Sequence, residues 1–401
     1  MKSALTIPEI SYHLHRLSSD LQNDLVEYSQ QNHWATKDLH EICNELELFI
    51  ESRSTHEPTY DVLLFMYAQL LFFSGNLTKL NDLFTITAST PTMGVQLYYA
   101  IGLVFQGHTQ EAEEILSRIL KDQTFNEQDD SFQLEVLGID LFIHSIKREY
   151  LKVAQKYEKL IDFAISKNLA TDEVGTHLLA IPKIRHAYSL RASGKVGEAI
   201  RLLKACQRDL ETFPHRYYQV MTLTRLGHCY HNGGRLKRAI ELYDEGIDIA
   251  LELQSWVLLS ILYNRVGFVM IQNENSSRAK DYFEKALTYA EMAGAIWLTI
   301  GPLANLARWK IAQGNIKEAI DDYHQFAKVA EGVGDHRELC YAQLGLADLY
   351  EKIDDIPKSM YYLGKGVELG VKLGILEIIP QDRQRKSSRQ RWSRYKDEEK
   401  N

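Results

Sequence analysis

The chain has 401 residues, of which 45% are hydrophobic and 25% charged, and its net charge at neutral pH is −8. This composition excludes a disordered or collagen-like chain, and no apolar run reaches the ~18 residues that span a bilayer, so we expect a soluble helical protein. Cys43, Cys206, Cys229 and Cys340 form no C-x-x-C pair, so we expect buried free thiols and neither a disulfide framework nor a zinc ribbon.

The N-terminal segment, residues 1–59, is expected to be a helical cap. Histidines and charged residues stand in residues 1–17, where a signal peptide needs an unbroken apolar stretch, so we expect a cytoplasmic protein. Residues 8–54 fit two amphipathic helices, and the second has an apolar face made of Leu39, Ile42, Cys43, Leu46, Phe49 and Ile50. No turn glycine joins these helices, which favours a cap over an eroded repeat.

A repeat of 40 residues follows and is clearest in five consecutive units from residue 181 onward. Its turn position is occupied by Gly194, Gly234, Glu274, Gly314 and Asp354. Five residues after the turn comes a small residue, and four residues further comes a large apolar one, as with Ala239 and Tyr243. A second glycine column ends the second helices, where a left-handed cap favours glycine: Gly294, Gly334 and Gly374.

Weaker copies extend the array toward the N-terminus. They place turns at Gly75 and Gly107, and a degenerate copy lies around Glu149. The predicted array covers residues 60–379 and holds seven or eight units.

Each unit reads as two antiparallel helices. In the first helix of the second clear unit, apolar or small residues lie 11, 8, 7 and 4 positions before the turn, on one face: Leu223, Leu226, Gly227 and Tyr230. The small Gly227 allows a close approach by the second helix, whose Ala239 and Tyr243 face it. One unit alone cannot bury these faces, so the units must stack, and we predict an all-α, right-handed α-solenoid.

The pattern L-x-x-L-G-x-x-Y, followed by a turn glycine and then by an alanine and an aromatic residue, resembles the tetratricopeptide repeat. The period of 40 residues exceeds the ~34 that are usual in that family, and we expect the extra residues to lengthen the second helix. Long units of this kind are similar to those of kinesin light chains, signal-transducing ATPase transcription activators and peptide-pheromone-sensing regulators. The resemblance implies that a peptide binds along the concave groove.

The groove lining is predicted from the first helix of each unit. Positions 13, 10, 6 and 3 before the turn form a stripe about 130° away from the packing face. Near the N-terminus this stripe is apolar, and burial by the cap or by a tightened superhelix is favoured over a hydrophobic ligand site. Its residues there are Phe65, Phe72, Leu97, Ile101 and Val104. Further along the chain, the candidate partner-binding residues are Arg185, Tyr188, Arg225, His228, His231, Asn264, Arg265, Phe268 and Arg308.

Three of these candidates form a ladder. Arg185, Arg225 and Arg265 stand nine positions before the turn in successive units, and Asn305 takes the same position in the next unit. A row of guanidinium groups suits an acidic peptide, or one that ends in a carboxylate. The alternative is that each arginine pairs with an acid of the adjacent helix and only joins neighbouring units. The sequence leaves both interpretations open.

Motifs for metal binding and catalysis are scarce. His228 and His231 stand beside Cys229, but neighbouring units supply no third or fourth ligand, so we expect no metal site. The charge of the two histidines is instead expected to tune partner binding near neutral pH. The sequence lacks phosphate-loop, nucleophile-elbow, zincin and dinucleotide-binding motifs, so we expect neither an enzyme nor a cofactor.

The C-terminal tail, residues 380–401, abandons the repeat. It carries eight Lys/Arg and four acidic residues, a net charge of +4, so the rest of the chain carries about −12 and is unsuited to nucleic acid. Trp392 and Tyr395 stand among the arginines, which suits contact with RNA, DNA or an anionic membrane. A disordered basic end or interaction arm is the commoner role of such a run.

The sequence therefore predicts a binding protein. The leading hypothesis is a cytoplasmic adaptor that holds a peptide segment of another protein, acidic if the ladder binds it, in the concave groove. The alternative is a regulatory sensor, in which a bound peptide compacts the superhelix and changes how the N-terminal helices engage a signalling protein.

Overall fold

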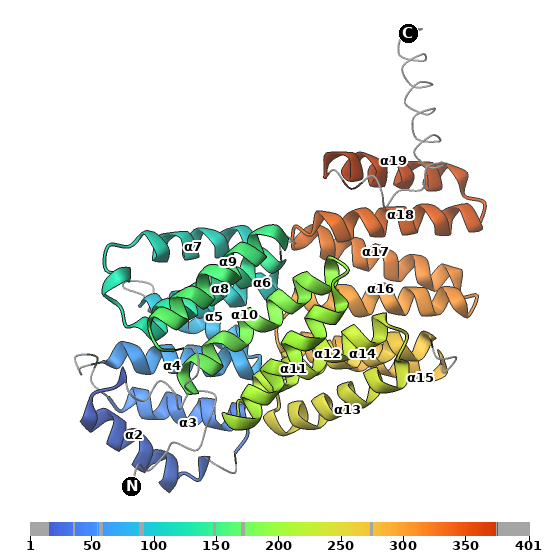
Figure 1. The fold of residues 1–401 in the computed structure, drawn as a ribbon. Helices are drawn as coiled ribbons and strands as arrows, with labels where there is room; N and C mark the ends of the chain where they lie inside the picture. Colours follow the sequence, from blue (N-terminus) through green and yellow to red (C-terminus); the bar gives the residue numbers. More distant parts are fainter. Residues whose placement is uncertain are drawn as a thin grey trace.

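The computed structural model describes residues 16–34, 37–53, 55, 59–87, 92–146, 150–169, 173–272, 276–373 and 375. In this part of the chain the secondary structure is helical and contains no strand, and successive helices pack side by side in a curved array (Figure 1). The α-solenoid predicted from the sequence is confirmed. None of the helices in the described ranges is long and apolar enough to span a membrane.

The helices before the clear repeats begin with α2 (Ser19–Gln31) and α3 (Leu39–Glu51). The six residues predicted for the apolar face of the second N-terminal helix are all buried in α3. Three helix pairs follow, with the short 3-10 helix η3 (Phe125–Glu127) between the second pair and the third. These pairs are α4 (Tyr60–Ser74) with α5 (Leu77–Ile86), α6 (Met93–Gln106) with α7 (Thr109–Lys121), and α8 (Asp130–Ile146) with α9 (Tyr150–Ser166).

Five helix pairs make up the clear repeats. They are α10 (Glu173–Ala192) with α11 (Val196–Thr212), α12 (Arg216–Asn232) with α13 (Leu236–Leu253), α14 (Trp256–Gln272) with α15 (Ser276–Met292), α16 (Ile296–Ala312) with α17 (Ile316–Gly332), and α18 (His336–Lys352) with α19 (Ile356–Lys372). In the last three pairs every helix has 17 residues. The expectation that the second helix takes the extra length is therefore wrong. Equal lengths let each helix cover the apolar face of its partner from end to end.

The backbone at the turns explains the glycines of the repeat. Gly194, Gly234 and Gly314 have φ of +81°, +73° and +81°, and Asp354 takes +58° at the same position. Glycine reaches this left-handed region without the steric cost that a Cβ atom adds. The glycines that end second helices are left-handed as well: Gly294 and Gly334. The predicted turns at Gly75 and Gly107 are left-handed too, with φ of +81° and +93°. Three further predicted turn and cap positions lie outside the described residues: Glu149, Glu274 and Gly374.

Close packing within a unit depends on a small residue in the first helix. A Cβ atom on Gly227 would lie 2.5 Å from Cε1 of Tyr243 in the second helix. One unit later, a Cβ atom on Gly267 would lie 2.7 Å from Cε1 of Phe283. The aromatic ring thus occupies the space that a larger side chain would need, as the sequence pattern predicts.

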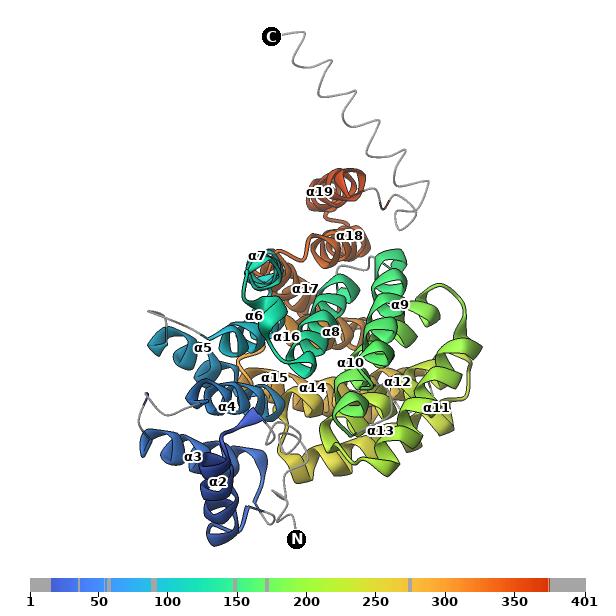
Figure 2. The same ribbon diagram turned by 60° about the vertical axis from the view of Figure 1, so that its left-hand side comes forward.

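The N-terminal helices close the solenoid on itself. The ring of His40 in α3 stacks on Trp256 at the start of α14, with 3.9 Å between ring centroids. Ser255 donates a hydrogen bond to the carbonyl oxygen of Phe73 in α4, 182 residues away in the sequence. Phe105 in α6 meets Trp297 in α16 edge to face. We call this contact, in which α3, α4 and α6 lie against the repeats, the seam (Figure 2).

The seam buries the apolar stripe of the N-terminal units. Each of its five residues is at most 3% exposed: Phe65, Phe72, Leu97, Ile101 and Val104. Phe72 packs on Tyr217 of α12, with 5.9 Å between ring centroids. The burial predicted from the sequence is confirmed, and contact between distant turns of the superhelix contributes to it.

Candidate functional site

A large cavity lies between the first helices of the clear repeats and the α6–α7 pair. Its volume is about 2250 Å³, more than twice the upper end of the ~300–1000 Å³ range of pockets for small ligands. Seven of the nine candidate residues line it: Arg185, Tyr188, Arg225, Asn264, Arg265, Phe268 and Arg308. His228 and His231 are not among the described residues that line it.

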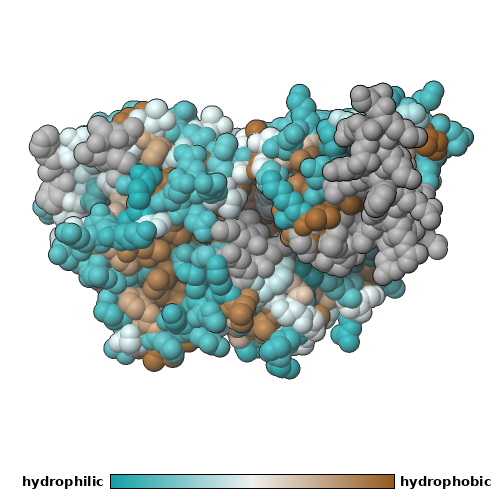
Figure 3. Space-filling model, turned by 90° about the horizontal axis from the view of Figure 1, so that it is seen from above, coloured by the Kyte–Doolittle hydropathy of each residue, from teal (hydrophilic) through white to brown (hydrophobic). Residues whose placement is uncertain are grey.

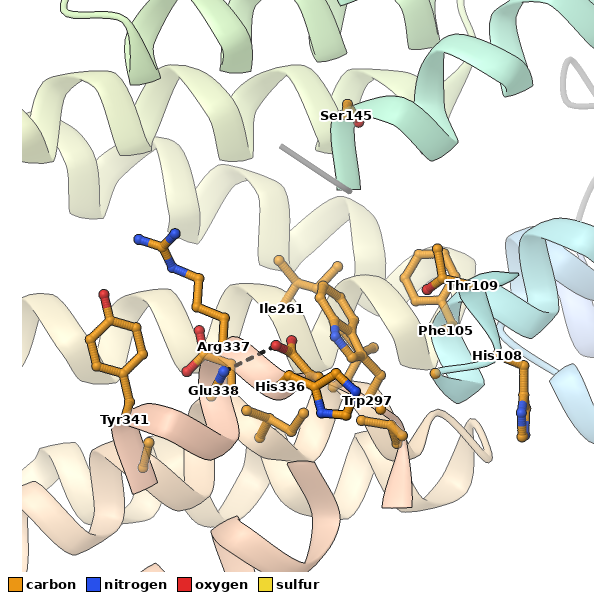
Figure 4. A pocket seen from close by; sticks show the side chains of 18 of the residues that line it. Phe105, His108, Thr109, Ser145, Ile261, Trp297, His336, Arg337, Glu338 and Tyr341 are labelled. Atoms are coloured by element: carbon orange, nitrogen blue, oxygen red, sulfur yellow. Dashed lines mark hydrogen bonds between the residues drawn. The ribbon is translucent and has the colours of Figure 1, made fainter. Parts of the chain in front are cut away.

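The lining stripe runs further toward the start of each helix than the sequence indicated. In α14 it consists of positions 14, 13, 10, 9 and 6 before the turn, the last three being Asn264, Arg265 and Phe268. His231, at position 3, is in the last turn of its helix and does not reach the cavity. Position 17 does reach it, and it adds Trp297 and Arg337, which the sequence analysis missed (Figure 4).

Continuing the stripe by one helical turn is the signal that identifies Trp297 and Arg337. No comparable pattern in the sequence assigns Phe105 or the lining residues of α7 to the cavity. They reach the cavity through the seam, which joins segments far apart in the sequence (Figure 4).

The three ladder arginines line the cavity without acidic partners. Within the described part of the chain, none of Arg185, Arg225 and Arg265 takes part in an ion pair. Arg185 is only 6% exposed, and its guanidinium carbon lies 4.0 Å from the centroid of the Phe142 ring in α8. The guanidinium of Arg225 lies 5.3 Å from the ring of Tyr188. Aromatic faces attract these cations but leave their hydrogen-bond donors unused.

The electrostatics of the ladder disfavour its own charge. Burial lowers the pKa of Arg185 well below its usual value, and the neighbouring Arg225 lowers it further. Burial, followed by the charge of Arg265, lowers the pKa of Arg225 to about 10. Desolvation and like-charge repulsion therefore both act on these residues, and an anion placed among them would relieve both. The described structure gives no support to the interpretation in which acids of adjacent helices pair with the ladder.

Asn305, which takes the position of the ladder arginines in the next unit, has a structural role. Asn305 of α16 donates a hydrogen bond to Oδ1 of Asn264 in α14, at 2.9 Å. Arg308, which is exposed, donates to Oδ1 of Asn305 at 3.2 Å. The two asparagines thus join neighbouring first helices at the cavity wall, and they present Arg308 beside the ladder.

The histidines differ from what the sequence indicated. Burial lowers the pKa of His228, and the nearby charges of Arg265, Arg191 and Arg225 lower it further, so the ring stays neutral near pH 7. The expectation that its charge tunes binding at that pH is therefore wrong for His228. His231 shares a hydrogen bond with Oε1 of Gln272 at 2.7 Å and meets Phe268 edge to face.

No cluster of three or more His, Cys, Asp or Glu side chains suited to a metal ion occurs among the described residues. All four cysteines are free and buried, as predicted.

The opposite wall of the cavity is acidic. Where α7 meets the corner between α17 and α18, six carboxylates line it: Glu111, Glu113, Glu114, Glu331, Asp335 and Glu338. Gly107 and Val333 touch at this place, so the two acidic groups face each other across the end of the seam. Figure 4 shows Arg337 and Glu338 on this wall. Seen from above, hydrophilic residues of the described chain are interspersed with hydrophobic ones (Figure 3).

Comparison with known proteins identifies the fold. No known protein family and no curated protein matches the sequence. Among solved structures, a Rap protein in complex with competence and sporulation factor aligns over 89% of this chain and 99% of its own, at 11% identity and a TM-score of 0.55.

Two further structures align at 15% identity. One is a signal transduction ATPase with numerous domains and a tetratricopeptide repeat sensor, from Pyrococcus horikoshii, over 86% of this chain and 55% of its own, with a TM-score of 0.48. The other is BtubC from P. vanneervenii, over 57% and 92%, with a TM-score of 0.47. At such identities the likeness concerns the fold alone, which is a solenoid of the tetratricopeptide-repeat type.

Proposed function

We propose that the protein is an interaction adaptor that holds a peptide segment of another protein in the cavity, with acidic groups of the peptide against the arginine ladder. The observation that supports this is the set of three arginines that line the cavity without an ion pair in the described structure. A buried guanidinium without a counter-ion carries a desolvation cost. A carboxylate of the ligand supplies the missing bidentate partner.

The size of the site favours a chain segment over a small metabolite. Adjacent packed helices lie ~8–10 Å apart, so a ladder on α10, α12 and α14 extends over roughly 20 Å. An extended chain covers that length with about six residues. Tyr188, Phe268 and Trp297 line the same cavity and offer apolar contacts to the same segment. The Rap protein with this fold has been solved in complex with a factor, so a solenoid of this type accommodates a bound partner.

Selection from a library of random dodecapeptides tests the proposal. The wild-type protein is expected to enrich Asp and Glu, and the R185Q/R225Q/R265Q variant is expected to lose that enrichment, because glutamine keeps polar contacts but removes the charge. Arg201→Gln, on the exposed side of α11, is the matched control and should enrich the same peptides as wild type. Circular dichroism and a thermal melt establish that each variant folds. Equal enrichment by wild type and a folded triple variant would refute the proposal.

A second candidate is a ligand-dependent regulator. Phe105 and Trp297 line the cavity and also form part of the seam, so a ligand in the cavity touches the contact that holds the N-terminal helices. Small-angle scattering with and without a selected peptide distinguishes the candidates. A change in the radius of gyration favours the regulator, and an unchanged radius favours the static adaptor.

A further inference from the structure

We infer that the cavity takes a dipolar peptide segment, with a negatively charged end on the arginine ladder and a positively charged end at the acidic wall. This inference rests on the proposed function and adds the polarity of the ligand to it. Among the described lining residues, the ladder side carries arginines without acids, and the carboxylates gather on α7 and around the α17–α18 corner, where Arg337 is the one arginine.

The lining contributed by the first helices of four clear repeats, α10, α12, α14 and α16, contains arginines and no acidic residue in the described structure. Arg185 is almost fully buried, faces the cavity and has no counter-ion among the described residues. This end of the cavity therefore selects an anion, whether a side-chain carboxylate or the carboxylate that ends a chain.

Four of the six carboxylates on the acidic wall have no cationic partner in the described structure. Glu111 and Glu114 on α7, and Glu331 and Asp335 at the α17–α18 corner, take part in no ion pair within the described ranges. Arg337 is the one described arginine on this wall, and its guanidinium lies 5.9 Å from the Tyr341 ring. The wall thus keeps an excess of negative charge that a cationic group of the ligand reduces.

The two walls belong to one cavity, so one ligand experiences both. The ladder begins on α10, and the acidic corner lies at the start of α18. Four steps between successive first helices separate α10 from α18 along the solenoid. At ~8–10 Å per step this is roughly 35 Å, which an extended chain covers with about ten residues. A short segment with opposite charges at its two ends satisfies both walls, and a segment with alternating charges places half of its groups against like charge.

Two decapeptides of identical composition test the inference. One carries three Glu and three Lys in separate terminal blocks, and the other carries the same residues in alternation. Exposed ion pairs contribute modestly, so we expect about three- to tenfold tighter binding of the segregated peptide in fluorescence anisotropy. The E111Q/E331Q variant should reduce the affinity for the segregated peptide to that for the alternating one. The matched control, E211Q/E245Q, removes two exposed acids from second helices and should preserve the difference.

A third decapeptide separates failure of this inference from failure of the proposed function. It carries the acidic block and neutral residues elsewhere, so it depends on the ladder alone. Its binding, and the loss of that binding in R185Q/R225Q/R265Q, supports the proposed function whatever the acidic wall does. Equal affinity of wild type for the segregated and alternating peptides, or an undiminished difference in E111Q/E331Q, would overturn the dipolar ligand.

Discussion

Replacing the half-buried Arg225 by methionine is expected to stabilise the free protein, although most substitutions destabilise. Arg225 has no acidic partner in the described structure, and burial and Arg265 lower its pKa to about 10. A base whose pKa falls by about 2.5 units on folding weakens the folded state at neutral pH by about 3 kcal/mol, at ~1.4 kcal/mol per unit. Water in the cavity screens part of this cost, so we expect a gain of about 1–3 kcal/mol when the charge is removed.

Urea unfolding at pH 7, followed by circular dichroism, measures this gain. Methionine preserves most of the apolar stem of arginine, so packing changes little. Arg201→Met, on the exposed side of α11, is the control and should change the free energy of unfolding by less than about 0.5 kcal/mol. Above pH 10 the folded protein releases the Arg225 proton before the unfolded chain does, so the advantage of the variant should shrink. A variant less stable than wild type at pH 7 would refute the reasoning.

Three further predictions concern packing, pH and the seam. Gly227→Ala places a Cβ atom 2.5 Å from Tyr243 and should lower the free energy of unfolding by about 1–3 kcal/mol. Gly364→Ala, which has open space around it in α19, should raise the free energy of unfolding by up to ~1 kcal/mol. Equal urea midpoints for the two variants would contradict this prediction. Burial lowers the pKa of His177 to about 4, so as the pH falls from 6.5 toward 4 only the unfolded chain takes up this proton, and stability should fall by up to ~1.4 kcal/mol per pH unit. His177→Gln should flatten that slope in urea titrations, and an unchanged slope would exclude His177 as its source. Trp256→Ala removes the ring that stacks on His40 and should speed amide hydrogen exchange in α3 and α4 relative to α18. Unchanged exchange rates in α3 and α4 would show that the seam does not depend on this contact.

The repeat and its packing were predictable because they depend on local spacing. Gly227 and Tyr243 belong to one helix pair, so their separation in the sequence fixes their approach in space. The ladder was predictable for the same reason, because a 40-residue period places Arg185, Arg225 and Arg265 on equivalent faces of stacked helices.

The seam and the acidic wall could not be predicted in this way. The contact between His40 and Trp256 depends on the total curvature of the solenoid over several units, and no local sequence pattern specifies that curvature. The neutral state of His228 depends on burial and on the charges of Arg265, Arg191 and Arg225, two of which come from neighbouring helices, so the local sequence around His228 does not indicate it. The division into a cap (residues 1–59), an array (residues 60–379) and a basic tail (residues 380–401) remains a prediction, since the tail lies outside the described residues.

The central claim is that the arginine ladder binds the acidic groups of a peptide, and a crystal structure of the protein with a selected acidic peptide tests it most directly. We expect carboxylate oxygens of the peptide within hydrogen-bond distance of Arg185, Arg225 and Arg265, inside the cavity. A peptide bound on the convex surface, or one that fills the cavity while the three guanidinium groups remain without a carboxylate, would contradict it.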